Sequence, residues 1–134
     1  MKVTIECSEE QARVIVDALD LYARIGIGQL HEVVWVWSSA YQTEIDARDA
    51  AEAAMDAVKA QLLPGYGRHG SRGIGNPGNA MTFTRAYDVK KTIEQAMAVA
   101  RDPNPKLLTV DYDGTINYAG EALPVVGVEP CAKP

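Results

Sequence analysis

The sequence predicts an α+β domain, mainly helical, with about four helices and a small antiparallel sheet that pairs an N-terminal strand with a C-terminal strand. Four segments repeat apolar residues at spacings of three and four, the period of an amphipathic helix. Residues 2–6 and 107–112, near the two ends of the chain, have the apolar pattern of short strands. A further segment, 125–128, is suited to an edge strand.

Length and composition favour one folded domain. A chain of 134 residues is the size of a single domain. We expect that domain to cover residues 1–118, with a glycine-rich loop at 64–80, and residues 119–134 to form a C-terminal tail. The net charge of −5 argues against binding to a nucleic acid polymer. No apolar run is long enough to cross a membrane, so we expect no membrane partner.

The cysteine content indicates a reduced, cytosolic protein. The chain has two cysteines, Cys7 and Cys131, near opposite ends. A disulfide framework needs more cysteines than this, although one bridge joining the termini is an open alternative. Neither cysteine has a companion at the spacing of a metal site, and we expect no metal and no cofactor.

The first helix has clear boundary signals. Ser8 and Gln11 have the spacing of a capping box, with acidic residues in the first turn, where the helix dipole favours them. The apolar pattern continues to about Ile25, and Gly26 is suited to the C-cap. Gly28 then lacks a structural reason, which favours a functional role for it.

A second segment is ambiguous between helix and strand. We predict a short helix over about 29–37, with a strand over 33–37 as the alternative, because the apolar run is short. The choice decides the relation of Trp35 to Trp37: they point to different sides of a helix but share one face of a strand.

Two longer helices follow. The third is expected over about 43–63, where Pro64 ends it. The fourth is expected to start near Thr82 or Thr84 and to end near Arg101, before a proline-containing break at 102–105.

The region from Leu62 to Tyr87 predicts a ligand site. It holds six of the eleven glycines, and no acid occurs between Ala57 and Tyr87 in a chain with 18 acids. Glycine allows close approach of the backbone to a ligand, and arginine suits phosphate or carboxylate. The loop candidates are therefore Arg68, Arg72 and Asn76; a flexible surface loop is the alternative.

Other candidates join this site. Arg24, Gly26, Gly28 and Gln29 follow one another at the end of the first helix, where a solvated helix corner is the alternative. Arg85 lies near the start of the fourth helix, whose exposed N–H groups favour anions. Trp35 or Tyr66 is suited to stack a base, although such aromatics are more often core or interface residues. We predict no catalytic residue.

Residues Leu108–Ile116 resemble motif one of the haloacid-dehalogenase-like phosphatases. The resemblance implies a nucleophile at Asp111 and a general acid/base at Asp113, with Mg²⁺, a lysine and further acids downstream. Only Lys133, Glu121 and Glu129 follow, so a strand ending in an Asp-Gly turn is the preferred interpretation.

Several phrases together resemble a group of small bacteriophage-encoded proteins. The resemblance covers Glu9–Ala12, Leu21–Leu30, Ser71–Asn76, Arg85–Val89, Asp102–Pro105 and Thr109–Asp113. It implies a phage or prophage origin and a location in the host cytoplasm. Small phage proteins often block host defence, and one class sequesters nucleotide signals.

We therefore predict a non-catalytic homo-oligomer that binds a small anionic nucleotide-like ligand, such as a cyclic nucleotide or an ADP-ribose-derived immune signal. Two other hypotheses stay open. One is a protein-interaction module that inhibits a host protein through its apolar helices. The other is a small phosphohydrolase that uses Asp111 and Asp113.

Overall fold

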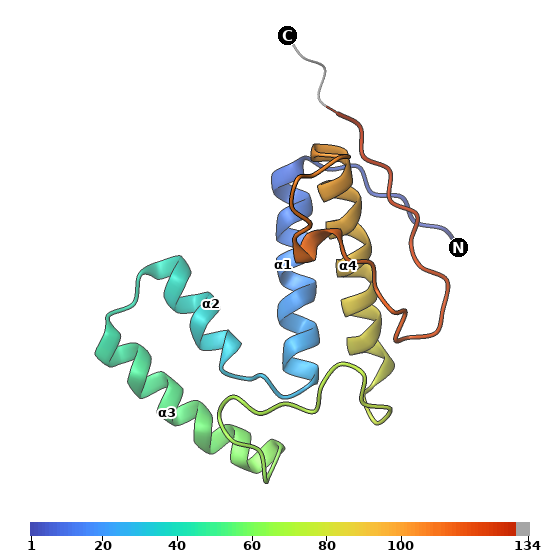
Figure 1. The fold of residues 1–134 in the computed structure, drawn as a ribbon. Coiled ribbons are helices and arrows are strands. Elements are labelled where there is room, and N and C mark those ends of the chain that lie inside the picture. The colour runs from blue at the N-terminus through green and yellow to red at the C-terminus, as the bar shows by residue number, and fades with distance from the viewer. Residues whose placement is uncertain (131–134) are drawn as a thin grey trace. The chain divides into compact units, whose positions relative to one another are not determined.

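The computed structural model describes residues 1–130 and contains four α-helices and one short 3₁₀ helix (Figure 1). Cys131, Lys133 and the end of the expected tail lie outside the described residues. The helices are α1 (Glu9–Gly26), α2 (Glu32–Tyr41), α3 (Ile45–Leu62) and α4 (Met81–Arg101), and the 3₁₀ helix is η1 (Val110–Tyr112).

The predicted sheet is wrong: residues 1–130 contain no strand. The segment 107–112 ends in η1, whose turn bonds join Tyr112 N–H to the Thr109 carbonyl and Asp113 N–H to the Val110 carbonyl. Side chains of α4 take the carbonyls that a strand partner would need. Lys91 Nζ donates to the Val110 carbonyl at 2.8 Å, and Gln95 Nε2 donates to that of Tyr112 at 2.9 Å. The backbone of this segment is thus satisfied without a ladder.

The helix predictions are confirmed within a few residues. The capping box of α1 is present, because Ser8 N–H donates to Gln11 Oε1 at 2.9 Å and Gln11 N–H donates to Ser8 Oγ at 3.2 Å. Residues 33–37 belong to α2, so the strand alternative for this segment is wrong.

The predicted roles of Gly26 and Gly28 are corrected by the end of α1. Gln29 N–H donates to the Arg24 carbonyl at 2.9 Å and Gly28 N–H to the Ile25 carbonyl at 3.0 Å, the bond pair of a Schellman motif. Gly28 has φ +94° and is therefore the left-handed capping residue. Gly26 serves a different purpose: a Cβ there would overlap the Phe83 ring. Both glycines have structural reasons.

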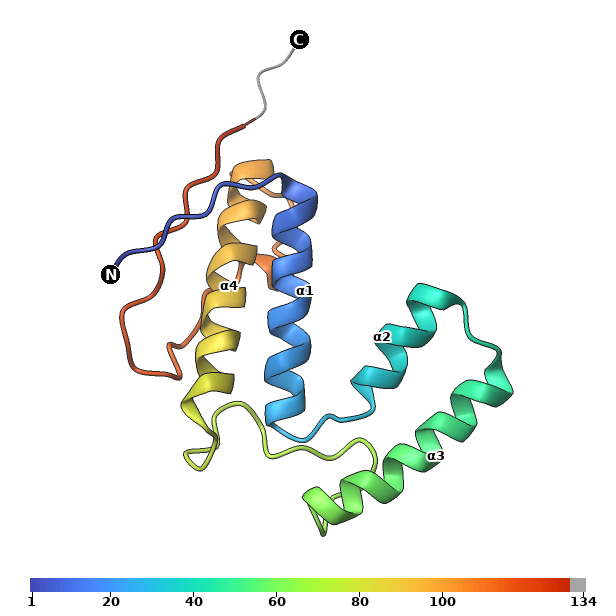
Figure 2. The same cartoon turned by 180° about the vertical axis from the view of Figure 1, so that it is seen from behind.

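The chain divides into two compact units. One comprises Met1–Asp20 with Thr84–Pro134, of which 131–134 are not described, and the other comprises Leu21–Phe83. In the first unit, α1 and α4 run antiparallel (Figures 1 and 2). Glu9 at the start of α1 pairs with Arg101 at the end of α4 at 3.0 Å. Asp20 pairs with Lys90, also at 3.0 Å.

Asp88 fastens the C-terminal segment to α4. Asp88 is buried, with only 2% of its surface exposed. Its carboxylate accepts hydrogen bonds from the backbone N–H groups of Tyr118 (3.0 Å) and Ala119 (2.8 Å) and from the Thr115 hydroxyl. A buried carboxylate needs such donors, and Ala119, the first residue of the expected tail, supplies one of them. Residues 115–119 are therefore held on the helix.

The second unit contains α2, α3 and the glycine-rich loop. Gln42, with φ 48°, ends α2 in the left-handed conformation, and α3 then returns beside α2. Ala23, Ile27 and Val34 are its buried hydrophobic residues. None of the helices in residues 1–130 combines the length and apolar character needed to cross a membrane.

We expect Gly26→Ala and Gly28→Ala each to destabilise the protein by about 1–3 kcal/mol, through overlap with Phe83 and through left-handed strain respectively. Denaturant unfolding measures both. Gly67→Ala is the matched control, because a Cβ at Gly67 meets nothing within 4 Å. Equal midpoints for all three variants would contradict this explanation.

Candidate functional site

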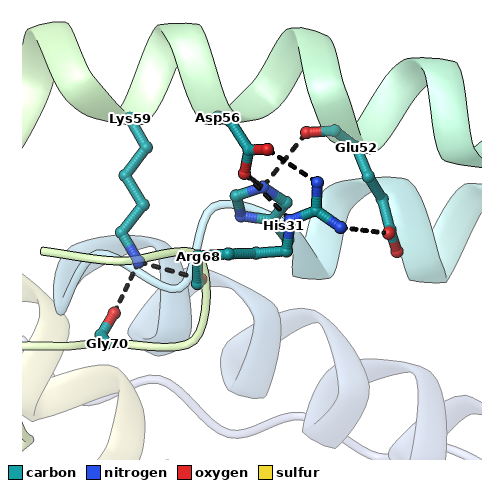
Figure 3. Close-up of polar contacts among 6 residues, drawn as sticks. All are labelled: His31, Glu52, Asp56, Lys59, Arg68 and Gly70. Carbon is teal, nitrogen blue, oxygen red and sulfur yellow. Dashed lines mark hydrogen bonds and ion pairs between the residues drawn. The ribbon is translucent and has the colours of Figure 1, made fainter.

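A polar cluster joins the glycine-rich loop to α3 (Figure 3). We call His31, Glu52, Asp56 and Arg68 the Arg68 cluster. The Arg68 guanidinium donates to both Asp56 oxygens, through Nε at 2.9 Å and Nη2 at 2.6 Å, and to Glu52 Oε2 through Nη1 at 3.0 Å. Three of its five N–H donors are thus held by α3 carboxylates. A bidentate pair of this kind fixes orientation as well as distance.

His31 completes the cluster from the residue before α2. Its Nε2 lies 2.8 Å from Asp56 Oδ1 and 3.2 Å from the Glu52 carbonyl. Both neighbours are acceptors, so Nε2 carries the proton. The residue is 6% exposed, and its Nδ1 has no hydrogen-bond partner within residues 1–130.

The cluster lowers the pKa of Asp56 to about 2. The main cause is the hydrogen bond from Arg68, and the hydrogen bond from His31 lowers it further, while desolvation opposes both. The pKa of Arg68 is raised by the same carboxylate. The pair therefore stays charged across the neutral range.

Lys59 holds the same loop from a second point. It is 1% exposed, and its ammonium donates to the carbonyls of Arg68 (3.0 Å) and Gly70 (2.5 Å) (Figure 3). A buried ammonium is costly unless hydrogen-bonded, and loop carbonyls provide that here. The first half of the glycine-rich loop is ordered around this side chain.

The second half of the loop is ordered by backbone and asparagine contacts. Arg72 N–H donates to the Ile27 carbonyl at 2.9 Å. Asn76 Oδ1 accepts from Gly78 N–H at 2.8 Å, and Asn79 Nδ2 donates to the Gly73 carbonyl at 2.8 Å. The loop is therefore tied by hydrogen bonds along its second half as well as its first.

Beside the Arg68 cluster lies a hollow of about 170 Å³ within the second unit. Its walls come from the corner after α1, from α2 and from the loop. Four of its lining residues were predicted as ligand-binding from the sequence, namely Arg24, Gln29, Trp35 and Arg68. Three further lining residues were missed, namely His31, Glu32 and His69.

Arg24 contacts Gln29 and Glu32 at the rim. Its Nη1 donates to Gln29 Oε1 at 2.8 Å and lies 3.6 Å from Glu32 Oε1. The second distance is longer than a hydrogen bond, so this ion pair is a loose one. The side chains of Arg24 and Glu32 are 41% and 36% exposed.

Trp35 is contacted by Arg48, a residue of α3. The Arg48 guanidinium lies 4.7 Å from the centroid of the indole ring, a cation–π distance. Arg48 does not line the hollow. Trp35 thus contacts a side chain of α3 and also borders the hollow.

The remaining predicted residues do not line this hollow. Tyr66 is 42% exposed in the loop. The Arg72 side chain lies against Gly78, so tightly that a Cβ there would overlap it, beside Asn76. Arg85 belongs to the other unit and is ion-paired with Glu121. Gly26 and Gly28 shape the corner that carries Arg24.

The region from Leu62 to Tyr87 has no acid before Tyr87 in the sequence, but in the structure carboxylates from other segments contact it. Acids outside the acid-free interval pair with two of its three arginines: Glu52 and Asp56 from α3 hold Arg68, and Glu121 holds Arg85. Long-range contacts of this kind leave no local signal. His31 likewise gives no local signal, because its partners lie 21 and 25 residues away.

Asp111 and Asp113, the residues of the phosphatase-like motif, lie in and directly after η1. Within residues 1–130, no group of three or more His, Cys, Asp or Glu side chains is placed to hold a metal ion.

Comparison with known proteins gives no further assignment. The chain matches no family model, no curated protein and no solved structure.

The lowered pKa of Asp56 predicts a specific loss of stability in acid. A carboxyl with a folded-state pKa below its ordinary value of 3.8 stabilises the fold above that value, and this contribution disappears as pH falls towards about 2. We expect Asp56→Asn to be less stable than wild type at pH 6 and to show a flatter stability profile between pH 5 and pH 2, measured by urea unfolding.

Asp17→Asn is the control for this experiment. Asp17 is an exposed α1 residue without a hydrogen bond or ion pair among the described residues. Its variant should keep the wild-type acid profile; an Asp56→Asn profile parallel to wild type would contradict the assignment.

Proposed function

We propose that this chain binds a small, anionic, nucleotide-like ligand at the hollow and sequesters it without chemical conversion. The observation that carries the proposal is convergence. Residues from three separate segments, Arg24 with Gln29, Trp35, and Arg68, line one hollow. These residue types were selected from the sequence for that chemistry, independently of where the fold would place them.

Trp35 is the proposed platform for the base. The Arg48 contact fixes one face of the indole, and a platform that is already oriented loses less entropy when a ligand stacks on it. Base stacking on an aromatic side chain is worth about 1–3 kcal/mol.

Arg24 is the proposed contact for the anionic group. Arg68 is committed to Glu52 and Asp56, so it serves to hold the wall in place. The Arg24–Glu32 ion pair is loose, and a phosphate oxygen at hydrogen-bond distance is a better partner for the guanidinium than a carboxylate at 3.6 Å. Glu32 would then be able to accept from N–H groups of a base.

The size of the hollow limits what enters it. Sites for whole drug-sized ligands measure about 300–1,000 Å³, and this hollow measures about 170 Å³. It is suited to one ring system, with the sugar and phosphate crossing the rim near Arg24. The resemblance to small phage proteins supports a role against host defence, with cyclic nucleotides or ADP-ribose-derived signals as the ligands to screen first.

Calorimetric titration with AMP, ADP-ribose and cyclic dinucleotides tests the proposal. We expect wild type to bind at least one of them and Trp35→Ala to weaken that binding about 5- to 150-fold, the range of one stacked base. Trp37→Ala is the matched control, because Trp37 is in the same helix, is 62% exposed and does not line the hollow.

A parallel pair of variants tests the anion contact. We expect Arg24→Gln to weaken binding at least tenfold, because a charge-assisted hydrogen bond is worth about 1.5–3 kcal/mol. Arg13→Gln changes an exposed arginine that pairs with Glu9 in α1, and it should bind as wild type does. Absence of binding across the panel, or equal losses in both members of either pair, would remove the hollow as the site.

A further inference from the structure

The outer face of α2 is strongly apolar and exposed. We call Val33, Val36, Trp37 and Tyr41 the α2 strip. Their exposed fractions are 42%, 51%, 62% and 68%, whereas Val34 and Ser38 on the inner face are buried. At 100° per residue, the four strip residues fall within one side of the helix.

The strip also contains a preformed aromatic pair. The rings of Trp37 and Tyr41, one turn apart, lie with centroids 4.5 Å from each other. Tryptophan and tyrosine are the residues that most often carry binding energy in interfaces. Their mutual contact limits the side-chain freedom that would be lost on association.

The area of the strip matches the centre of a protein interface. Fully covered aromatic side chains bury about 150–250 Å² each, so the strip presents on the order of 450 Å². Apolar patches of this size on monomers are often functional. A stable interface buries about 800 Å² on each partner, so the strip would supply about half of one partner's share.

The charge pattern favours a second copy of the chain as the partner. Glu32 is the only charged residue of α2, and none occurs from Val33 to Tyr41. Two such strips meet without burying a charge or opposing like charges. Val33, Trp37 and Tyr41 are spaced by four, so Trp37 is the centre of the row.

We propose that α2 is a self-association surface, in which two copies pack antiparallel about a twofold axis near Trp37. The axis places each Trp37 beside its counterpart and Val33 opposite Tyr41 of the other copy, a small residue against a large one. Antiparallel packing also opposes the two helix dipoles. The hollow lies within one chain, so this association is independent of the proposed ligand.

Analytical ultracentrifugation of the full chain from about 1 to 100 µM tests the proposal. We expect wild type to reach twice the chain mass of 14.5 kDa, about 29 kDa. Val36→Glu should raise the dimer dissociation constant at least tenfold, because each copy would bring a carboxylate into the contact. Val14→Glu, an equally drastic change at a 67% exposed position of α1, should leave dimerisation unchanged.

Circular dichroism is to check that both variants remain helical. If Val36→Glu fails to fold, the less drastic Val36→Ala gives the dimer dissociation constant instead. The proposal is overturned by a wild-type monomer at every concentration, by an assembly that neither Val36 variant weakens, or by equal weakening by Val14→Glu. A one-to-one complex of monomeric chain with a different protein also overturns it.

Discussion

The structure of the second unit depends on one interaction, the hydrogen-bonded ion pairs between α3 carboxylates and the Arg68 guanidinium. Two carboxylates, Glu52 and Asp56, hold three of its N–H groups, and Lys59 one turn later holds the neighbouring carbonyls. Together they convert a glycine-rich loop, which would otherwise lose much conformational entropy on ordering, into a fixed wall. The hollow beside it exists because that wall is fixed. Glycine supplies the backbone freedom to reach α3, and the charged groups supply the reason to remain there.

The same principle operates in the first unit with different partners. Asp88 holds backbone N–H groups of the C-terminal segment, and Lys91 and Gln95 hold its carbonyls. In both units a buried polar side chain on a helix replaces the strand partner that an irregular segment lacks. This satisfies the backbone, since an unpaired buried N–H or carbonyl group is costly. It also accounts for the buried polar residues Lys59, Asp88 and Lys91.

The hydrophobic residues are distributed in the complementary way. Small side chains such as Ala23, Ala86 and Ala98 are buried, while Trp37 and Tyr41 remain largely exposed. Small buried residues permit close helix packing but contribute little apolar area. The large exposed residues of α2 are therefore available for association. The inner face of this short helix packs within the unit, and the outer face is exposed. Trp35 and Trp37, two positions apart, illustrate the separation: one borders the hollow and the other lies in the α2 strip.

Local signals in the sequence determined the helices and their ends, because caps, periodicity and proline act within a few residues. Ser8 with Gln11 predicted the start of α1, and Pro64 the end of α3. Residue type also marked Arg24, Gln29 and Trp35 as ligand-binding candidates, but the fold decided that these three line one hollow. Tertiary structure alone decided the rest. Whether 107–112 forms a strand depended on the hydrogen bonds from Lys91 and Gln95. Whether the positive charge of Arg68 is neutralised depended on carboxylates 12 and 16 residues before it. Neither can be read locally, because electrostatic and hydrogen-bond partners are chosen by distance in space.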